Sequence, residues 1–116
     1  ALTWPERIED SALQRYDPVA SSPLTFEPID TEAFPLFAVG VDAGRRGAAA
    51  PAAFNAGNEI AVAAFLQERL GFVDMADVVR EAVASVEGMP VRDVLDVQAA
   101  DLRARQAAQA AIQRLN

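Results

Sequence analysis

The sequence contains no cysteine and no histidine among its 116 residues. Zinc–thiolate sites, disulfide bonds, cysteine nucleophiles and acid–base catalysis by histidine are therefore excluded from this chain. A metal ion held by these residues would have to be a hard cation bound through oxygen.

Positive charge and long apolar runs are also scarce. Lysine and arginine total 10 against 17 acidic residues, which gives a net charge of −7. A protein that binds duplex nucleic acid or an anionic membrane through basic side chains has the opposite balance, so we expect neither partner. No run of about 18 apolar residues occurs, and no basic segment precedes an apolar core. We therefore expect no membrane-spanning helix and no signal peptide, and a cytoplasmic location.

What is present is apolar enough for one globular domain. Apolar residues make up 52% of the chain and charged residues 23%, and a chain of this length buries a substantial core. The sequence does not open with methionine, and we expect it to be part of a longer polypeptide. The alternative is a processed chain.

Residues 1–30 differ in composition from the rest. Four of the seven prolines lie there, and each fixes φ and removes a backbone donor. We expect an extended arm and linker over residues 1–30, with at most one short strand at Leu24–Phe26. The apolar side chains of this arm follow no regular period, so we expect them to lie on another surface, either the following domain or polypeptide outside this chain. They are Trp4, Leu13, Tyr16, Leu24 and Phe26.

Residues 31–116 show helical periodicity and predict a separate helical domain. The expected helices span about residues 35–46, 51–70, 75–87 and 97–115, with Asp74 and Asp96 as N-caps of the last two. Glycines at 47, 71 and 88 are expected to end the first three. The prediction is an all-α fold, a four-helix bundle-like domain preceded by the arm.

The apolar stripes predict which faces are buried. In the first helix Phe34, Phe37, Ala38 and Val41 share one face, and the Gly40/Gly44 pair suggests close approach to another helix. The second helix is apolar nearly all round, which is typical of a central helix. The third and fourth each carry one long apolar stripe. Those stripes comprise Met75, Val78, Val79, Ala82, Val83 and Val86 in the third helix, and Val97, Ala100, Ala104, Ala107, Ala108, Ala111, Ile112 and Leu115 in the fourth.

One polar cluster lies on the expected central helix. Asn55 and Glu59 are four residues apart and share a face, and Asn58 is their neighbour. Amide and carboxylate oxygens together could hold a metal or a substrate. The alternative, which we favour, is a structural hydrogen-bond network, because a carboxylate on a buried helix needs a donor such as a backbone N–H or an arginine. We expect Glu59 to be at least partly buried with both oxygens hydrogen-bonded.

Other candidate motifs have simpler interpretations. Residues 44–47, Gly-Arg-Arg-Gly, lie at a helix C-terminus, where arginines complement the negative end of the helix and phosphate is disfavoured. The carboxylate pairs Asp74/Asp77 and Asp93/Asp96 are typical of caps and first-turn charges. Composition and spacing alone indicate no catalytic residue and no metal ligand.

Several strings nevertheless resemble one enzyme family. They are Leu2-Thr3-Trp4-Pro5, Leu24-Thr25-Phe26 followed by Phe34-Pro35, Asn55-Ala56-Gly57-Asn58-Glu59 with Val62-Ala63-Ala64-Phe65-Leu66, and Phe72-Val73-Asp74-Met75. Together they cover nearly the whole chain and resemble the C-terminal part of 1-deoxy-D-xylulose 5-phosphate reductoisomerases.

The resemblance implies a function that resides in a larger enzyme. Such enzymes use NADPH and a divalent cation (Mg, Mn or Co) to convert 1-deoxy-D-xylulose 5-phosphate into 2-C-methyl-D-erythritol 4-phosphate, in non-mevalonate isoprenoid synthesis. It implies that residues 1–30 are the end of the central catalytic domain and the linker, and that residues 31–116 are the C-terminal helical domain. Its implied partners are the catalytic and NADPH-binding domains of the same chain, a second copy in a homodimer, and the sugar phosphate.

The family's metal-binding and phosphate-binding motifs do not occur here, so the resemblance assigns this chain no catalytic residue and no metal ligand. It implies one cofactor contact, an apolar contact from Leu2 near the nicotinamide. We expect the chain alone to be inactive and to serve as a support. The alternatives are an independent all-helical interaction module and a stand-alone metal protein built on Glu59.

Overall fold

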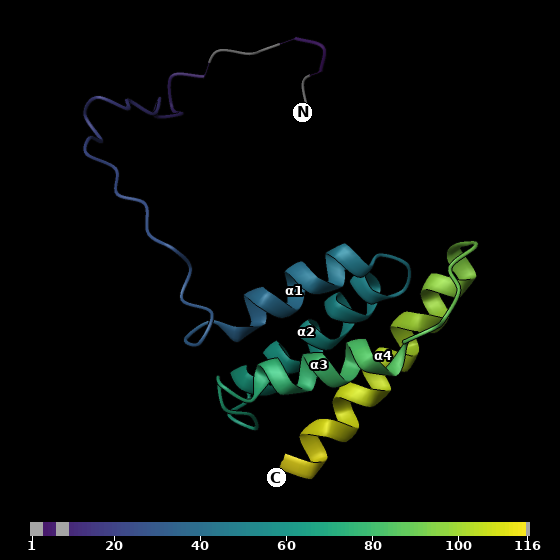
Figure 1. Cartoon of the computed structure of the whole chain (residues 1–116). Coiled ribbons are helices and arrows are strands. Elements are labelled where there is room, and N and C mark those ends of the chain that lie inside the picture. The colour runs from purple at the N-terminus through teal and green to yellow at the C-terminus, as the bar shows by residue number, and fades with distance from the viewer. Residues whose placement is uncertain (1–3, 7–9, 116) are drawn as a thin grey trace.

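The computed structural model describes residues 4–6 and 10–115, and its regular structure is entirely helical (Figure 1). The helices are α1 (Pro35–Arg46), α2 (Ala50–Leu66), α3 (Met75–Ser85) and α4 (Val94–Leu115). No strand occurs in the described part of the chain. The predicted all-α fold with four helices is confirmed.

Helix α1 begins and ends where the sequence predicts. Pro35 occupies the first turn, where its missing N–H costs no hydrogen bond. Gly47 follows the last turn with φ +64°, and its N–H donates to the carbonyl of Ala43. Arg45 and Arg46 lie in the last turn, beside the negative end of the helix.

Helix α2 ends four residues earlier than predicted. We expected it to continue to Leu70, but Glu68 adopts φ +58°, and the chain turns away there. The N–H of Arg69 donates to the carbonyl of Ala64, and that of Glu68 donates to Phe65. These two bonds form a Schellman motif, with a glutamate at the left-handed position that glycine usually occupies.

The predicted caps of α3 and α4 need correction. Asp74 precedes α3, but its own backbone is already helical, and its side chain makes no capping hydrogen bond. The cap of α4 is Asp93 rather than Asp96, because Asp93 Oδ1 accepts the backbone N–H of Asp96 at 3.0 Å. Asp96 in turn accepts the backbone N–H of Arg92 at 3.0 Å, a reciprocal arrangement similar to a capping box.

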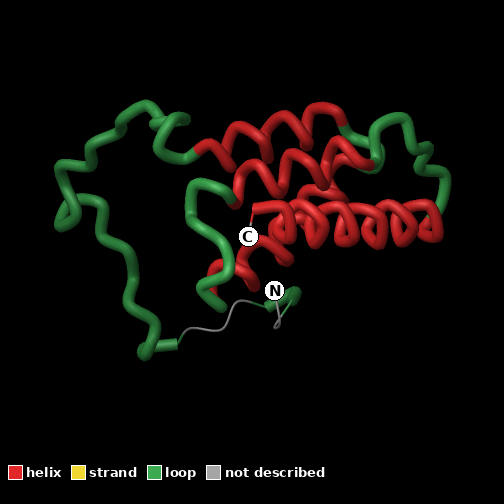
Figure 2. Tube along the Cα trace, turned by 90° about the horizontal axis from the view of Figure 1, so that it is seen from below, coloured by secondary structure: helices red, strands yellow, loops and turns green. Residues whose placement is uncertain are grey.

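Helix α2 is central, as predicted: it packs against α1, α3 and α4, and α3 also contacts α1 and α4. Figure 2 shows the helices (red) packed together and the arm (green) looping away from them. Helices α1 and α4 do not pack on each other, so the described helices form a three-helix core with α1 added on one side. The core is built mostly of alanine, and its largest fully buried side chains are Val78 and Val79. Backbones approach closely as a result: a Cβ on Gly57 would lie 2.6 Å from the Cβ of Ala82.

The predicted inner face of α1 is wrong. Ala43 is buried, and Leu36 and Val39 pack against the core, whereas Phe34 and Phe37 remain 55% and 49% exposed. Helix α1 has apolar residues on two faces, and periodicity could not tell which one meets α2 and α3. The expectation of close approach holds for Gly40 alone, where a Cβ would lie 3.0 Å from the ring of Phe54.

The stripe of α3 is confirmed, and that of α4 is confirmed except near its ends, whereas the apolar surface of α2 is exposed at Ala63, Phe65 and Leu66. All six predicted residues of α3 and its flank are buried, as are Ala100, Ala104, Ala108, Ala111 and Ile112 of α4. Val97 and Leu115, toward the ends of α4, are partly exposed, and Leu66 at the end of α2 is 75% exposed. For α4 the reason is geometric, because with 22 residues it is the longest of the described helices and extends beyond the others.

The arm extends away from the helices (Figure 1), and each described residue of the arm and of the segment that joins it to α1, up to Phe34, is exposed. The strand expected at Leu24–Phe26 does not form, because no described strand lies beside it to complete the hydrogen-bond ladder. Asp10, Asp17 and Asp30 instead order local turns by accepting backbone N–H groups from residues two or three positions later. Of the two surfaces expected to cover the apolar side chains of the arm, the following domain is not the one in this structure, and polypeptide outside this chain stays a prediction.

Candidate functional site

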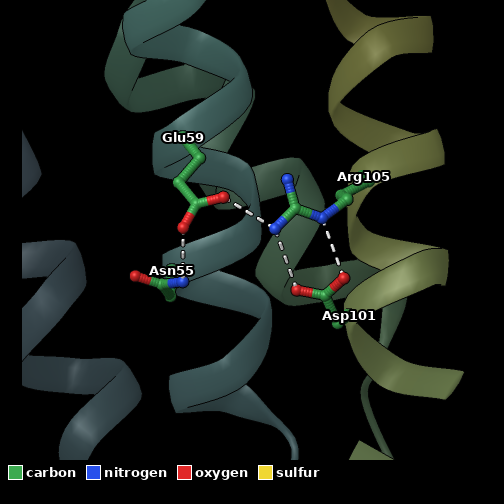
Figure 3. A network of polar contacts seen from close by, with 4 residues as sticks. All are labelled: Asn55, Glu59, Asp101 and Arg105. Carbon is green, nitrogen blue, oxygen red and sulfur yellow. Dashed lines mark hydrogen bonds and ion pairs between the residues drawn. The ribbon is translucent and has the colours of Figure 1, made fainter. Parts of the chain in front are cut away.

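The predicted polar cluster of α2 forms part of a network that reaches α4 (Figure 3). The Asn55 amide donates to Glu59 Oε1 at 3.0 Å. Glu59 Oε2 accepts the guanidinium of Arg105 at 2.7 Å. Arg105 also donates to both oxygens of Asp101, at 2.8 and 3.2 Å. Asn58 makes none of these hydrogen bonds.

Helical spacing places all four side chains. Asn55 and Glu59 are one turn apart on α2, and Asp101 and Arg105 are one turn apart on α4. The buried alanines of both helices, including Ala56 and Ala104, bring the two pairs together. The network therefore lies at the edge of the α2–α4 contact, where the alanine core meets solvent.

The burial predicted for Glu59 is wrong, and its hydrogen bonding is confirmed. The Glu59 side chain is 53% exposed, and that of Arg105 is 32% exposed. Because α2 turns this face toward the margin of α4, the carboxylate remains in contact with water. The partner of Glu59 is an arginine, one of the two kinds of donor that the sequence suggested. The sequence analysis did not identify Arg105 or Asp101. The Asp101/Arg105 spacing of four on an alanine-rich helix was the available signal.

Electrostatics fixes the charge states of this network. Hydrogen bonds from Arg105 and then Asn55, together with the positive charge of Arg105, lower the pKa of the Glu59 carboxyl. The hydrogen bonds to Asp101 and then Glu59 raise the pKa of the Arg105 guanidinium. A group suited to general acid–base catalysis near neutral pH has its pKa moved toward 7, and both of these shifts point away from 7.

The network also does not suit a metal ion. Its guanidinium lies between the two carboxylates and would repel a cation placed there. No group of three or more acidic side chains in the described residues is arranged to hold a metal. The arrangement instead joins α2 to α4, which is the structural interpretation favoured by the sequence.

The remaining candidate motifs also have local structural roles. Arg46 pairs with Asp42 at 2.7 Å within α1. Arg80 pairs with Asp77 within the first two turns of α3. Hydrogen bonds from the side chain and backbone of Arg92 lower the pKa of Asp96, at the start of α4. These pairs stabilise helix ends and converge on no common site.

Two further predictions from the sequence concerned a cofactor contact and membrane-spanning helices. Leu2, the predicted nicotinamide contact, lies outside the described residues, so its role stays a prediction. No helix in the described ranges is both long and apolar enough to cross a bilayer.

Comparison with known proteins gives a consistent family. The family model "DXP reductoisomerase C-terminal domain" matches residues 1–107. Among curated relatives, the 1-deoxy-D-xylulose 5-phosphate reductoisomerases of Ralstonia pickettii and Heliobacterium modesticaldum are 45% and 42% identical over 93% and 90% of this chain. The chain spans only 27% of the length of either relative.

A solved structure gives the same result. The 1-deoxy-D-xylulose 5-phosphate reductoisomerase of Zymomonas mobilis, in complex with NADPH, is 36% identical, with a TM-score of 0.81 over 97% of this chain and 29% of its own. Sequence and helix arrangement therefore agree over almost the whole chain. The chain belongs to the DXP reductoisomerase C-terminal domain family.

Proposed function

We propose that this chain is the C-terminal part of an NADPH- and divalent-metal-dependent reductoisomerase that converts 1-deoxy-D-xylulose 5-phosphate into 2-C-methyl-D-erythritol 4-phosphate. The observation that carries the proposal is the family match over residues 1–107 together with coverage of only 27% of the first relatives. Under it, the chain supports catalysis, while polypeptide outside the chain binds the metal, the phosphate group and most of the NADPH. A cytoplasmic location and a homodimer of the whole enzyme are parts of the same proposal.

The described residues favour a supporting role over a chemical one. Their main polar network is an arginine held between two carboxylates, with charge states fixed by mutual hydrogen bonds. No described acidic cluster fits a metal ion. The core gives α2 and α3 close backbone contact, which makes a stiff body for another domain to rest on.

The division into an arm (residues 1–30) and a helical domain (31–116) belongs to this proposal. Residues 35–115, which hold all four helices, are 81 of the 116 residues, about 70%. The match to the longer solved relative covers 97% of this chain and therefore extends beyond the helices into the arm. The described residues of the arm are exposed here. This supports an arm that is held in place by polypeptide outside this chain.

The test compares the longer polypeptide with the 116-residue chain. We expect the longer polypeptide to oxidise NADPH when 1-deoxy-D-xylulose 5-phosphate and Mg²⁺ or Mn²⁺ are added, and the 116-residue chain to show neither turnover nor NADPH binding by calorimetry. An inactive longer polypeptide, or tight NADPH binding by the short chain, would contradict the proposal.

A further inference from the structure

Helix α1 has a second apolar face, which the helical core leaves uncovered. Phe34, Phe37, Ala38 and Val41 follow the helical repeat on this face, and the two phenylalanines are 55% and 49% exposed. Leu36, Val39 and Ala43 form the other face, toward α2 and α3. A helix with apolar residues on two faces is typical of one that packs between two bodies.

The uncovered face continues into an apolar groove. Phe34, Phe37, Phe54, Phe72 and Met75 line a hollow of about 370 Å³ between the N-terminal ends of α1 and α3, and no charged residue lines it. Phe72 is 56% exposed and meets Phe65 edge to face, with ring centroids 6.1 Å apart. The aromatic surface therefore extends from α1 across to the α2–α3 connection, an exposed apolar area of the kind that marks an interface.

We propose that this surface, the outward face of α1 with its groove, is covered by polypeptide of the same molecule that precedes the arm. The proposal rests on the proposed function, because it requires that a longer polypeptide exists. Without a charged lining, the groove suits an apolar partner surface rather than a charged ligand or an acidic peptide.

The arm identifies this occupant. Phe34, the first aromatic of the surface, follows the arm by only four residues, so whatever the arm carries is tethered close to the groove. In Figure 1 the arm (purple to blue) leaves the N-terminal end of α1 and extends away from the helices, so it leaves the groove uncovered while holding any preceding polypeptide near it. A tethered surface has an effective concentration in the millimolar range, which favours it over a second copy at ordinary protein concentrations.

The experiment measures whether the face is covered in the longer polypeptide. The chain has no cysteine, so Phe37→Cys places one thiol on the face, and Gln106→Cys, on the exposed side of α4, provides a matched control. Each variant is made in the 116-residue chain and in the longer polypeptide and treated with a maleimide in native buffer. The labelled peptide is quantified by mass spectrometry.

We expect Phe37→Cys to react roughly tenfold or more slowly in the longer polypeptide than in the short chain, and Gln106→Cys to react equally in both. Equal rates for Phe37→Cys would overturn the proposal. Slow labelling of the short chain that speeds up on dilution would also overturn it, because a second copy would then be the occupant. Ala38→Cys, a smaller change on the same exposed face, repeats the test if Phe37→Cys does not fold.

Turnover of the longer polypeptide is assayed separately, so that the two proposals can fail independently. If the longer polypeptide is active and Phe37→Cys reacts freely in it, the proposed function stands and the docking proposal fails. If the longer polypeptide is inactive but protects Phe37→Cys, the docking proposal stands and the proposed function fails.

Discussion

The alanine core predicts that a larger side chain on the buried face of α2 destabilises the protein. Ala61 is completely buried, and α2 is packed against α1, α3 and α4. A leucine there adds three carbons. With room to accept them, burial would contribute roughly 0.8 kcal/mol per carbon and raise stability by about 2 kcal/mol. Without room, overpacking costs about 1–3 kcal/mol.

We expect overpacking to dominate at Ala61. The core residues nearby in sequence, Ala56 and Ala64, are also completely buried, and a Cβ on Gly57 would already lie 2.6 Å from the Cβ of Ala82. The helices must therefore move apart to admit a leucine. At roughly 4 °C per kcal/mol for a chain of this size, Ala61→Leu should lower the Tm by about 4–12 °C.

The assay is thermal unfolding followed by circular dichroism at 222 nm. Ala63→Leu is the matched control, because Ala63 lies on the exposed side of the same helix and leucine has nearly the helix propensity of alanine. Its stability should change by less than about 0.5 kcal/mol. The argument from close packing would be refuted if Ala61→Leu raised the Tm, or if it changed the Tm no more than Ala63→Leu does. Either result would show that the core has spare volume.

Three further predictions concern the α2–α4 network and the end of α2. Arg105→Ala should lower the Tm at neutral pH, because it leaves the carboxylates of Glu59 and Asp101 without their cation; the exposed Arg103→Ala serves as control, and equal melting of the two variants would contradict this role. Because the folded pKa of Glu59 is lowered, its stabilisation is present above its unfolded pKa and is lost as pH falls through the folded value; Glu59→Gln should flatten this part of the acid unfolding profile, and an unchanged profile would count against the shift. Glu68→Gly should stabilise the protein by about 0.5 kcal/mol in urea unfolding. Glycine removes the backbone strain of a glutamate at φ +58°, and this gain exceeds the loss from the greater entropy of glycine in the unfolded chain. A loss of stability would argue against the Schellman turn.

The sequence predicted the number and type of the helices because their signals are local. Pro35 and Gly47 fix the ends of α1 through backbone geometry alone, and the valines of α3 repeat with helical period. The end of α2 could not be read in the same way. Glu68 turns the chain there, and a glutamate carries no local preference for the left-handed region that would announce a stop.

The polar cluster was predicted in part. The spacing of Asn55 and Glu59 showed that they share a face, and the need to pair a carboxylate indicated an arginine. Which arginine it is depends on how α2 lies against α4, 46 residues away in the sequence. The same long-range packing decides how much of Glu59 remains in contact with water, and there the prediction was wrong.

By itself, the sequence determined that this chain is helical, acidic and without cysteine or histidine, and its strings of residues resembled one enzyme family. These properties follow from composition and from interactions within a few turns of chain. Only the tertiary structure decided which face of α1 is buried, since Phe34, Phe37 and Val41 form as good a helical stripe as Leu36, Val39 and Ala43. Periodicity identifies an apolar face, whereas the shape of the neighbouring helices selects which face they cover.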